Sequence, residues 1–254
     1  MDNCSRFQTI ICVPCYNESK RLKKEAFLSF VNEHRHTAFL FVNDGSTDNT
    51  LEVLNEFVKE HENLHVLNLE QNGGKAEAVR QGMLYASQTF KPQYIGFWDA
   101  DLATPLDELP NFTTIIREQK FDIITGLRLM RLGAKVKRKN SRHFLGRIFA
   151  TVASNVLRLP VYDTQCGAKL YKAELVPDLF DEKFTTRWLF DVEILARYVK
   201  RYGSDKAKID IYEYPVFAWE DKHGSQVKTK DFIKAPIELW KIKRRYFSKR
   251  RPAK

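Results

Sequence analysis

Two aspartates, Asp99 and Asp101, stand directly after an apolar run, Tyr94–Trp98, that carries no charge. Two carboxylates this close repel each other unless a cation lies beside them. Their hard oxygen atoms suit Mg²⁺ or Mn²⁺, and such an ion can bridge to a diphosphate and neutralise charge on a departing nucleotide. The alternative is a turn in which a residue of 101–104 caps the next helix. The position after a strand favours the metal site, with Asp99, Ala100 and Asp101 as its loop.

Three further polar segments follow predicted strands. Asp44 ends an apolar run and can accept hydrogen bonds from a base or a ribose. Gly74 and Lys75 open a predicted helix, where free backbone amides and an ammonium group can meet an anion. A lone Gly-Gly also fits an ordinary turn, and Ser46 or Asp48 can cap the following helix. The three segments are 14–18 (Pro-Cys-Tyr-Asn-Glu), 43–46 (Asn-Asp-Gly-Ser) and 72–75 (Asn-Gly-Gly-Lys).

Two other motifs match the sequence patterns of known sites but lack the structural context that those sites need. His61 and His65 form an H-E-x-x-H pattern, which binds zinc only when both imidazoles lie one turn apart on one helix. Here a helix is predicted to end before a strand begins at Leu64, so the two rings should diverge. Cys12 and Cys15 form a C-x-x-C pattern, but thiol redox chemistry would leave the acidic loops without a role. We therefore expect no zinc site, and two buried thiols.

The alternation of two periodicities predicts the fold. Short β-rich runs at 9–13, 38–42, 64–69, 94–98 and 121–125 are separated by helical patterns, of which 75–85 is the clearest. Strands joined by helical crossovers imply an α/β fold with a mostly parallel, doubly wound sheet. Ligands bind such sheets beyond the carboxyl ends of the strands, where all four polar segments lie. Beyond residue 140 we expect helices at 142–157 and 188–199 and a strand at 168–171.

Charge is distributed unevenly along the 254 residues. The net charge is +10, but residues 1–126 carry −6 and residues 127–254 carry +16. A basic half suits nucleic acid, anionic lipid headgroups or a phosphorylated substrate, and charge alone does not choose among them. The 43% of hydrophobic residues excludes intrinsic disorder, and the longest uncharged stretch, residues 7–17, is too short to span a bilayer. The N-terminus lacks the regions of a signal peptide, so we expect a cytoplasmic protein.

The C-terminal segment predicts contact with a membrane surface. We expect a domain over residues 1–230 and a basic amphipathic extension over residues 231–254. At 100° per residue the apolar residues of 232–251 fall on one side, opposite Lys234, Lys241, Arg245 and Lys249. Trp and Phe beside basic residues are typical of a helix lying in the membrane interface. The alternative is a helix packed on its own domain. The apolar residues are Phe232, Ile233, Ile237, Trp240 and Phe247.

Taken together and in order, these segments resemble family 2 glycosyltransferases of the GT-A fold. Within that family the resemblance is to the group that acts on polyprenyl phosphates, which includes the dolichyl-phosphate glucosyltransferases and mannosyltransferases. It covers about residues 8–230. The matching segments are 13–18, 42–48, 72–75, 78–82, 99–104, 126–128, 163–169 and 187–193.

The resemblance implies roles for individual residues on the donor side. Pro14, Tyr16 and Glu18 would line the nucleotide pocket, and Asp44 would hold the base or ribose. Asp99 and Asp101 would approach the ribose and a diphosphate bound to Mg²⁺ or Mn²⁺, and Arg128 would face the phosphates. Ala103-Thr104 follows the pattern of glucosyltransferases rather than the Gln-His of mannosyltransferases, which favours UDP-glucose. Cys15 and Asn43 depart from the family pattern, so base selectivity stays open.

On the acceptor side, a polyprenyl phosphate has a second pKa of about 6, so its oxyanion needs little help from a general base. Arg187 is a candidate to bind it, and Asp191 and Glu193 would orient Arg187 or act on the acceptor. We expect an inverting hexosyltransferase at the membrane surface, with no nucleic-acid partner. The alternatives are a polysaccharide or glycolipid acceptor, a GDP-mannose donor and, more distantly, a nucleic-acid-binding protein. Further cations lie just past the sheet, at Arg131, Lys137, Arg138 and Arg142.

Overall fold

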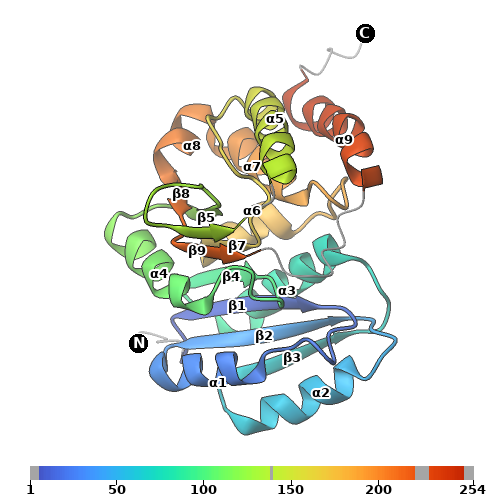
Figure 1. Ribbon diagram of the computed structural model, residues 1–254, viewed down its shortest axis with the longest axis vertical. Coiled ribbons are helices and arrows are strands. Elements are labelled where there is room, and N and C mark those ends of the chain that lie inside the picture. The colour runs from blue at the N-terminus through green and yellow to red at the C-terminus, as the bar shows by residue number, and fades with distance from the viewer. Residues whose placement is uncertain (1–5, 138–139, 221–228, 249–254) are drawn as a thin grey trace.

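The five β-rich runs form strands of one sheet, and two later strands complete it. The computed structural model describes residues 6–137, 140–220 and 229–248, with backbone only for 140–145 and 229–233. The strand order is β3-β2-β1-β4-β7-β5-β8. All neighbours are parallel except β7, which is antiparallel to β4 and β5. The predicted doubly wound sheet is confirmed (Figure 1). The strands are β1 (Thr9–Cys15), β2 (Thr37–Asp44), β3 (Leu64–Leu69), β4 (Tyr94–Trp98), β5 (Ile123–Leu127), β7 (Ala168–Lys172) and β8 (Ile211–Pro215).

The strand order reverses at β1. β2 and β3 lie on one side of β1, whereas β4 pairs with its other side. In an open parallel sheet, the ligand crevice forms at this switch point, beyond the carboxyl ends of the strands. Those ends lead into residues 14–18 after β1 and into Asp99–Asp101 after β4. The topology therefore brings these two segments together.

The antiparallel strand β7 begins beside the aspartates. Trp98 pairs with Ala168, and the Asp99 amide N–H donates to the Gly167 carbonyl oxygen at 2.9 Å. A Cβ atom at position 167 would lie 2.0 Å from Asp99 Oδ2. Any side chain at 167 would therefore displace the Asp99 carboxylate, which fills the space that it would need.

Helices cover both faces of the sheet (Figure 1). Because side chains alternate along a strand, Ile10 and Cys12 join one core while Ile11 and Val13 join the other. The first core packs α3, α5, α7 and α9 on the sheet, and the second packs α1, α2 and α4. The helices are α1 (Lys24–Glu33), α2 (Thr50–Phe57), α3 (Lys75–Phe90), α4 (Leu109–Glu118), α5 (Asn140–Leu157), α6 (Val176–Phe180), α7 (Phe190–Tyr202), α8 (Ser204–Asp210) and α9 (Thr229–Phe247). A separate pair of short strands, β6 (Lys135–Lys137) and β9 (Ala218–Glu220), lies beside the sheet.

The predicted local structure of the His61–His65, Cys12–Cys15 and Asp48 motifs is confirmed. α2 ends at Phe57 and β3 begins at Leu64, so His61 and His65 do not share a helix. Cys12 and Cys15 are fully buried in the two different cores, and burial raises the pKa of both thiols. Asp48 Oδ1 accepts the backbone N–H of Thr50 at 3.0 Å at the start of α2. Neither cysteine is placed for redox chemistry with the other.

The C-terminal helix α9 packs on the domain and also exposes apolar side chains. Ala235, Leu239 and Ile242 are buried against the core that α5 and α7 share. Ile237 and Trp240 are 58% and 57% exposed. Phe247, which the sequence groups with Trp240 on one side of the helix, is partly buried against the first core and so is not exposed as Trp240 is. The side chains of Phe232 and Ile233, and all of Lys249, lie outside the described residues.

Within the described residues, none of the helices combines the length and the apolar character needed to cross a bilayer.

Candidate active site

Hydrogen bonds tie the loops at the switch point to one another. The Asn17 N–H donates to Ser46 Oγ at 3.1 Å, and the Glu18 N–H donates to Thr50 Oγ1 at 2.8 Å. Asn72 Nδ2 donates to the Asp44 carbonyl oxygen at 3.1 Å. The segments after β1, β2 and β3 therefore form one connected rim, as the sequence predicts from their positions after the strands.

Asp44 holds the Gly73-Gly74 turn. Its two carboxylate oxygens accept the N–H groups of Gly73 and Gly74, each at 2.8 Å. Burial raises the pKa of Asp44, and the two backbone bonds act in the opposite direction. Gly74 has a φ of +85°, which L side chains rarely adopt. In addition to the base or ribose contact that the sequence predicts, Asp44 thus has a positioning role: it fixes the turn that begins α3 and carries Lys75.

Lys75 lies against the aspartates. Its Nζ is 2.5 Å from Asp99 Oδ1, and Asp99 is the first of the carboxylates that raise the pKa of Lys75 against the effect of burial. Asp101 Oδ1 accepts the Ala103 N–H at 2.9 Å. Burial raises the pKa of Asp101, and the negative charge of Asp99 adds to the effect. The loop therefore holds two carboxylates with one nearby ammonium group.

Glu18 extends this acidic group from the β1 side. Its Oε1 pairs with Arg21 at 2.8 Å, whereas Oε2 is buried with no hydrogen-bond partner among the described residues. Burial raises the pKa of Glu18, and Asp101 and Asp48 contribute in the same direction. A positive group entering the crevice would be stabilised by this excess of carboxylates.

Asp99 and Asp101 suit a divalent cation that is also coordinated by a bound diphosphate. Among the described residues, no three His, Cys, Asp or Glu side chains are grouped closely enough to hold a metal ion by themselves. Mg²⁺ characteristically binds through one or two carboxylates and completes its shell with water and substrate phosphates. Asp99 and Asp101 supply that number of carboxylates, and burial, together with the charge of Asp99, raises the pKa of Asp101. A metal held jointly by these residues and a diphosphate is compatible with this donor set.

Arg128 is held rigidly by Asp163. Its Nε and Nη2 donate to Asp163 Oδ2 and Oδ1 at 2.6 and 2.7 Å, and its guanidinium lies 5.2 Å from the Trp219 ring centroid. Only 13% of its side chain is exposed. Asp99 is also among the charges that act on Arg128. Arg128 is therefore pre-positioned near the crevice as a fixed planar cation.

Lys169 is a buried cation that sequence reasoning did not assign a role. Its Nζ donates to Asp191 Oδ1 at 2.6 Å and to the carbonyl oxygens of Cys166 and Thr164 at 2.5 and 3.1 Å. Its side chain is only 1% exposed. Asp191 is also buried; burial raises its pKa, and Lys169 and Lys75 lower it. A lysine near the start of β7, a strand whose first four residues are buried, was the available signal. Lys169 joins α7 to the loop that carries Asp163 and Gly167.

Arg187 and Glu193 have different roles. Arg187 is exposed, and its Nη2 donates to the Gly73 carbonyl oxygen at 3.3 Å, above the turn that begins α3. Glu193 is 0% exposed and accepts bonds from the N–H groups of Thr185 and Thr186 and from the Tyr246 hydroxyl. The prediction that Glu193 acts on a substrate is wrong for this geometry, because protein groups surround its carboxylate. Glu193 instead orients the segment that leads to Arg187, the other role considered from the sequence.

The remaining predicted residues are placed as follows. Pro14 and Tyr16 are half-buried at the end of β1, and Ala100 is buried between the two aspartates. Arg131 Nη2 donates to the Pro215 carbonyl oxygen at 3.3 Å, and Lys137 lies 3.8 Å from Glu220. The side chains of Arg138 and Arg142 lie outside the described part of the chain.

Comparison with known proteins places these features in a family. The family described as Glycosyl transferase family 2 matches residues 10–180. A dolichyl-phosphate beta-glucosyltransferase of Trichomonas vaginalis is 33% identical over 254 residues, covering 94% of this chain and 71% of the relative. One from Saccharomyces cerevisiae is 30% identical over 258 residues, covering 93% and 74%. Glucosyl-3-phosphoglycerate synthase from Mycobacterium tuberculosis, solved with Mn²⁺, UDP and glucosyl-3-phosphoglycerate, has a TM-score of 0.64 at 17% identity, covering 93% of this chain and 80% of that chain. At that identity the last comparison shows a shared fold.

Proposed function

Because the chain belongs to glycosyl transferase family 2, we propose that it transfers glucose from UDP-glucose to a polyprenyl phosphate. The observation that carries the proposal is the charge arrangement at the switch point. Asp99 contacts the Lys75 ammonium group, its charge also acts on the fixed Arg128 guanidinium, and Asp101 lies beside it, so a donor diphosphate and an acceptor phosphate could meet here. The relatives named dolichyl-phosphate beta-glucosyltransferase support this donor sugar and acceptor class.

The donor would lie along the loops after β1, β2 and β4. Pro14, Tyr16 and Glu18 would line the nucleotide pocket, with Asp44 at its inner end. Asp99 would face the ribose, and Asp99 and Asp101 would hold a Mg²⁺ or Mn²⁺ ion, which when bound neutralises charge on the leaving diphosphate. Lys75 adds a cation beside Asp99, next to the free amides at the start of α3. These groups stabilise the charge that develops on the departing UDP.

The acceptor would enter from the Arg128 side. A phosphate oxygen of the polyprenyl phosphate attacks the anomeric carbon of glucose, while the bond from that carbon to the diphosphate oxygen breaks and UDP leaves. Attack opposite the leaving group inverts the anomeric configuration. The nucleophile is already ionised near neutral pH, because its second pKa is about 6. Catalysis then depends on positioning the acceptor phosphate and neutralising its charge. Arg128 and the exposed Arg187 are the cations that would do so.

The donor assignment is tested by calorimetric titration. We expect UDP-glucose and UDP to bind in the presence of Mn²⁺ and to bind at least about tenfold more weakly without it, because the Asp99 and Asp101 carboxylates repel a bare diphosphate. GDP-mannose, titrated in the same way, is the control for the nucleotide and the sugar. Tighter binding of GDP-mannose would support the same type of transfer with GDP-mannose as the donor.

The rival functions predict other results. A polysaccharide or glycolipid acceptor predicts donor binding without turnover of polyprenyl phosphate. A nucleic-acid-binding protein predicts oligonucleotide affinity that falls steeply with salt and indifference to all three nucleotides. The carboxylates Glu18, Asp99 and Asp101 would repel a nucleic-acid backbone at the switch point, which favours the transferase.

Contact with an anionic membrane surface would bring the enzyme to its lipid acceptor. On α9, Ile237 and Trp240 are exposed one helical turn before Lys241 and Arg244, and the Arg244 guanidinium lies 5.4 Å from the Trp240 ring centroid. α5, which lies beside α9 in Figure 1, exposes Ile148 at 50%. Exposed apolar side chains on one side of a helix, next to a polar face rich in Lys and Arg, are typical of interfacial binding.

The double variant Ile237→Ser/Trp240→Ser tests this contact. We expect its binding to vesicles that contain an anionic phospholipid to weaken at least about tenfold in co-sedimentation, because two apolar anchors are lost. Ile209→Ser is the control, since Ile209 is 71% exposed on α8. Equal vesicle binding by the double variant and the unchanged protein would place the contact elsewhere. Truncation at residue 241 is unsuitable, because it removes the buried Ile242 and the Tyr246 bond to Glu193.

A further inference from the structure

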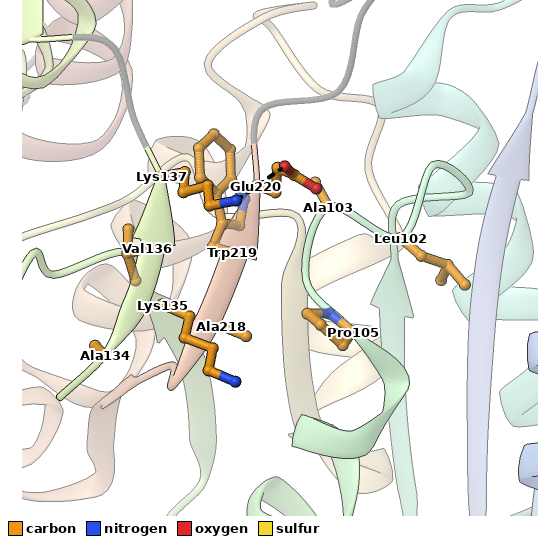
Figure 2. A pocket seen from close by; sticks show the side chains of 10 residues that line it. All are labelled: Leu102, Ala103, Pro105, Ala134, Lys135, Val136, Lys137, Ala218, Trp219 and Glu220. Atoms are coloured by element: carbon orange, nitrogen blue, oxygen red, sulfur yellow. Dashed lines mark ion pairs between the residues drawn. The ribbon is translucent and has the colours of Figure 1, made fainter.

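A pocket of about 430 Å³ lies between the β6–β9 strand pair and the segment that follows Asp101. Figure 2 shows Leu102, Ala103 and Pro105 on one side and the two strands, with Trp219, on the other. The Glu220 N–H donates to the Ala103 carbonyl oxygen at 3.0 Å. The pocket is therefore directly attached to the loop that carries the two aspartates.

The lining of this pocket suits an apolar ligand. Among the described residues that form it, none has a hydroxyl or amide side chain. Its walls are made by Leu102, Pro105, Val136 and Trp219 together with three alanines. The other three lining residues, Lys135, Lys137 and Glu220, are charged. Apolar residues therefore make up most of the lining.

Cations stand at the margins of the same pocket. Lys135 and Lys137 line it, and Glu220 offsets part of their charge at 3.8 Å from Lys137. The Arg128 guanidinium lies 5.2 Å from the centroid of the Trp219 ring, which lines the pocket. Apolar walls beside fixed cations are complementary to a ligand with an anionic head and a hydrocarbon chain.

Exposed apolar side chains continue from the pocket to the surface. Met130, Leu132 and Phe217 are 45%, 100% and 47% exposed. All three belong to the two segments that carry β6 and β9, which are joined by the bond from the Lys135 N–H to the Phe217 carbonyl oxygen at 2.7 Å. A hydrocarbon chain leaving the pocket would thus meet further apolar side chains.

From these contacts we infer that the pocket binds the isoprene units next to the phosphate of the acceptor lipid, with that phosphate at Arg128. The inference rests on the proposed function, because the ligand is the proposed acceptor. It assigns specificity for a prenyl chain to the β6–β9 pair and to Trp219, separately from the donor loops. A phosphate without a hydrocarbon chain would forgo this contact.

Filling the pocket tests the inference. Ala134→Trp places an indole among the lining residues, and Asp205→Trp adds the same group on α8, where the Asp205 side chain is 96% exposed. Farnesyl phosphate is the probe, and its binding is measured by calorimetry in the presence of UDP and Mn²⁺, beside its turnover with UDP-glucose. Each buried methylene is worth about a factor of four in affinity. We expect Ala134→Trp to lower the affinity for farnesyl phosphate at least tenfold and to leave the affinity for UDP unchanged. Asp205→Trp should change neither affinity.

The outcomes separate the pocket from the reaction. If the unchanged protein does not bind farnesyl phosphate, or if Ala134→Trp binds it as well as the unchanged protein does, the inference is overturned. If farnesyl phosphate binds, if Ala134→Trp weakens this binding, and if farnesyl phosphate is never glucosylated, the inference about the pocket is supported and the proposed transfer reaction is contradicted. Unchanged UDP affinity confirms that the variant is folded, so a loss of farnesyl phosphate alone reports on the pocket.

Discussion

The variant Asp101→Asn should lower kcat/KM for sugar transfer at least about 100-fold, with a comparable loss of metal-dependent donor binding. Removing one negative charge takes away one of the two carboxylates proposed to hold the metal. The same charge also attracts the ion to a crevice in which Lys75 already offsets part of the charge of Asp99. The loss is measured by steady-state kinetics with UDP-glucose and by calorimetry with UDP in the presence of Mn²⁺.

The fold should survive this change. The only hydrogen bond described for the Asp101 side chain runs from the Ala103 N–H to Oδ1, and an asparagine carbonyl can accept it equally well. Asp107→Asn is the matched control, because Asp107 is exposed a few residues further along the same segment. Both variants should melt within a few degrees of the unchanged protein. Full activity in Asp101→Asn would remove Asp101 from the metal site.

The sheet could be predicted from the sequence because its strands have a local signature. Each of the first five strands is a short apolar or alternating run followed by a polar segment, and the connection rules of α/β proteins then place those segments at one edge. Asp99 and Asp101 could be located in this way without any contact information. The direction of β7 could not, because its sequence, Ala168–Lys172, is equally compatible with either direction of pairing.

The roles of individual carboxylates were harder to predict, because they depend on contacts between distant residues. The sequence predicts that Asp44 binds a base or a ribose. It does not predict that the Asp44 oxygens also accept the N–H groups of Gly73 and Gly74, 29 and 30 residues away. Glu193 reads as a carboxylate on a helix that faces the substrate, whereas Tyr246 and the 185–186 backbone surround it. In α9, helical periodicity groups Phe247 with Trp240, but packing against α5 and α7 buries a different set of positions.

The variant Lys169→Met should be strongly destabilised, by about 3–5 kcal/mol in chemical denaturation, which is typical for removing one partner of a buried ion pair. The change leaves the buried Asp191 carboxylate and the carbonyl oxygens of Thr164 and Cys166 without the ammonium group that they share. Lys172→Met, three residues further along β7, should cost about 1 kcal/mol or less, because Lys172 is 28% exposed and Asp122 keeps its bond from Tyr198. Equal losses in the two variants would contradict the role given to Lys169.

The double variant Lys169→Met/Asp191→Leu separates the stability of the fold from the geometry of the site. Replacing both members of a buried ion pair by apolar residues is often neutral, so the double variant should recover most of the stability lost by Lys169→Met. Its activity should stay low, because the loop from Asp163 to Gly167 loses the ammonium group that fixes two of its carbonyl oxygens. That loop sets the position of Arg128 through Asp163 and leaves the space that Asp99 occupies beside Gly167. If activity returned together with stability, Lys169 would serve the fold alone, and the positions of Arg128 and Asp99 would be fixed by the remaining contacts of the sheet.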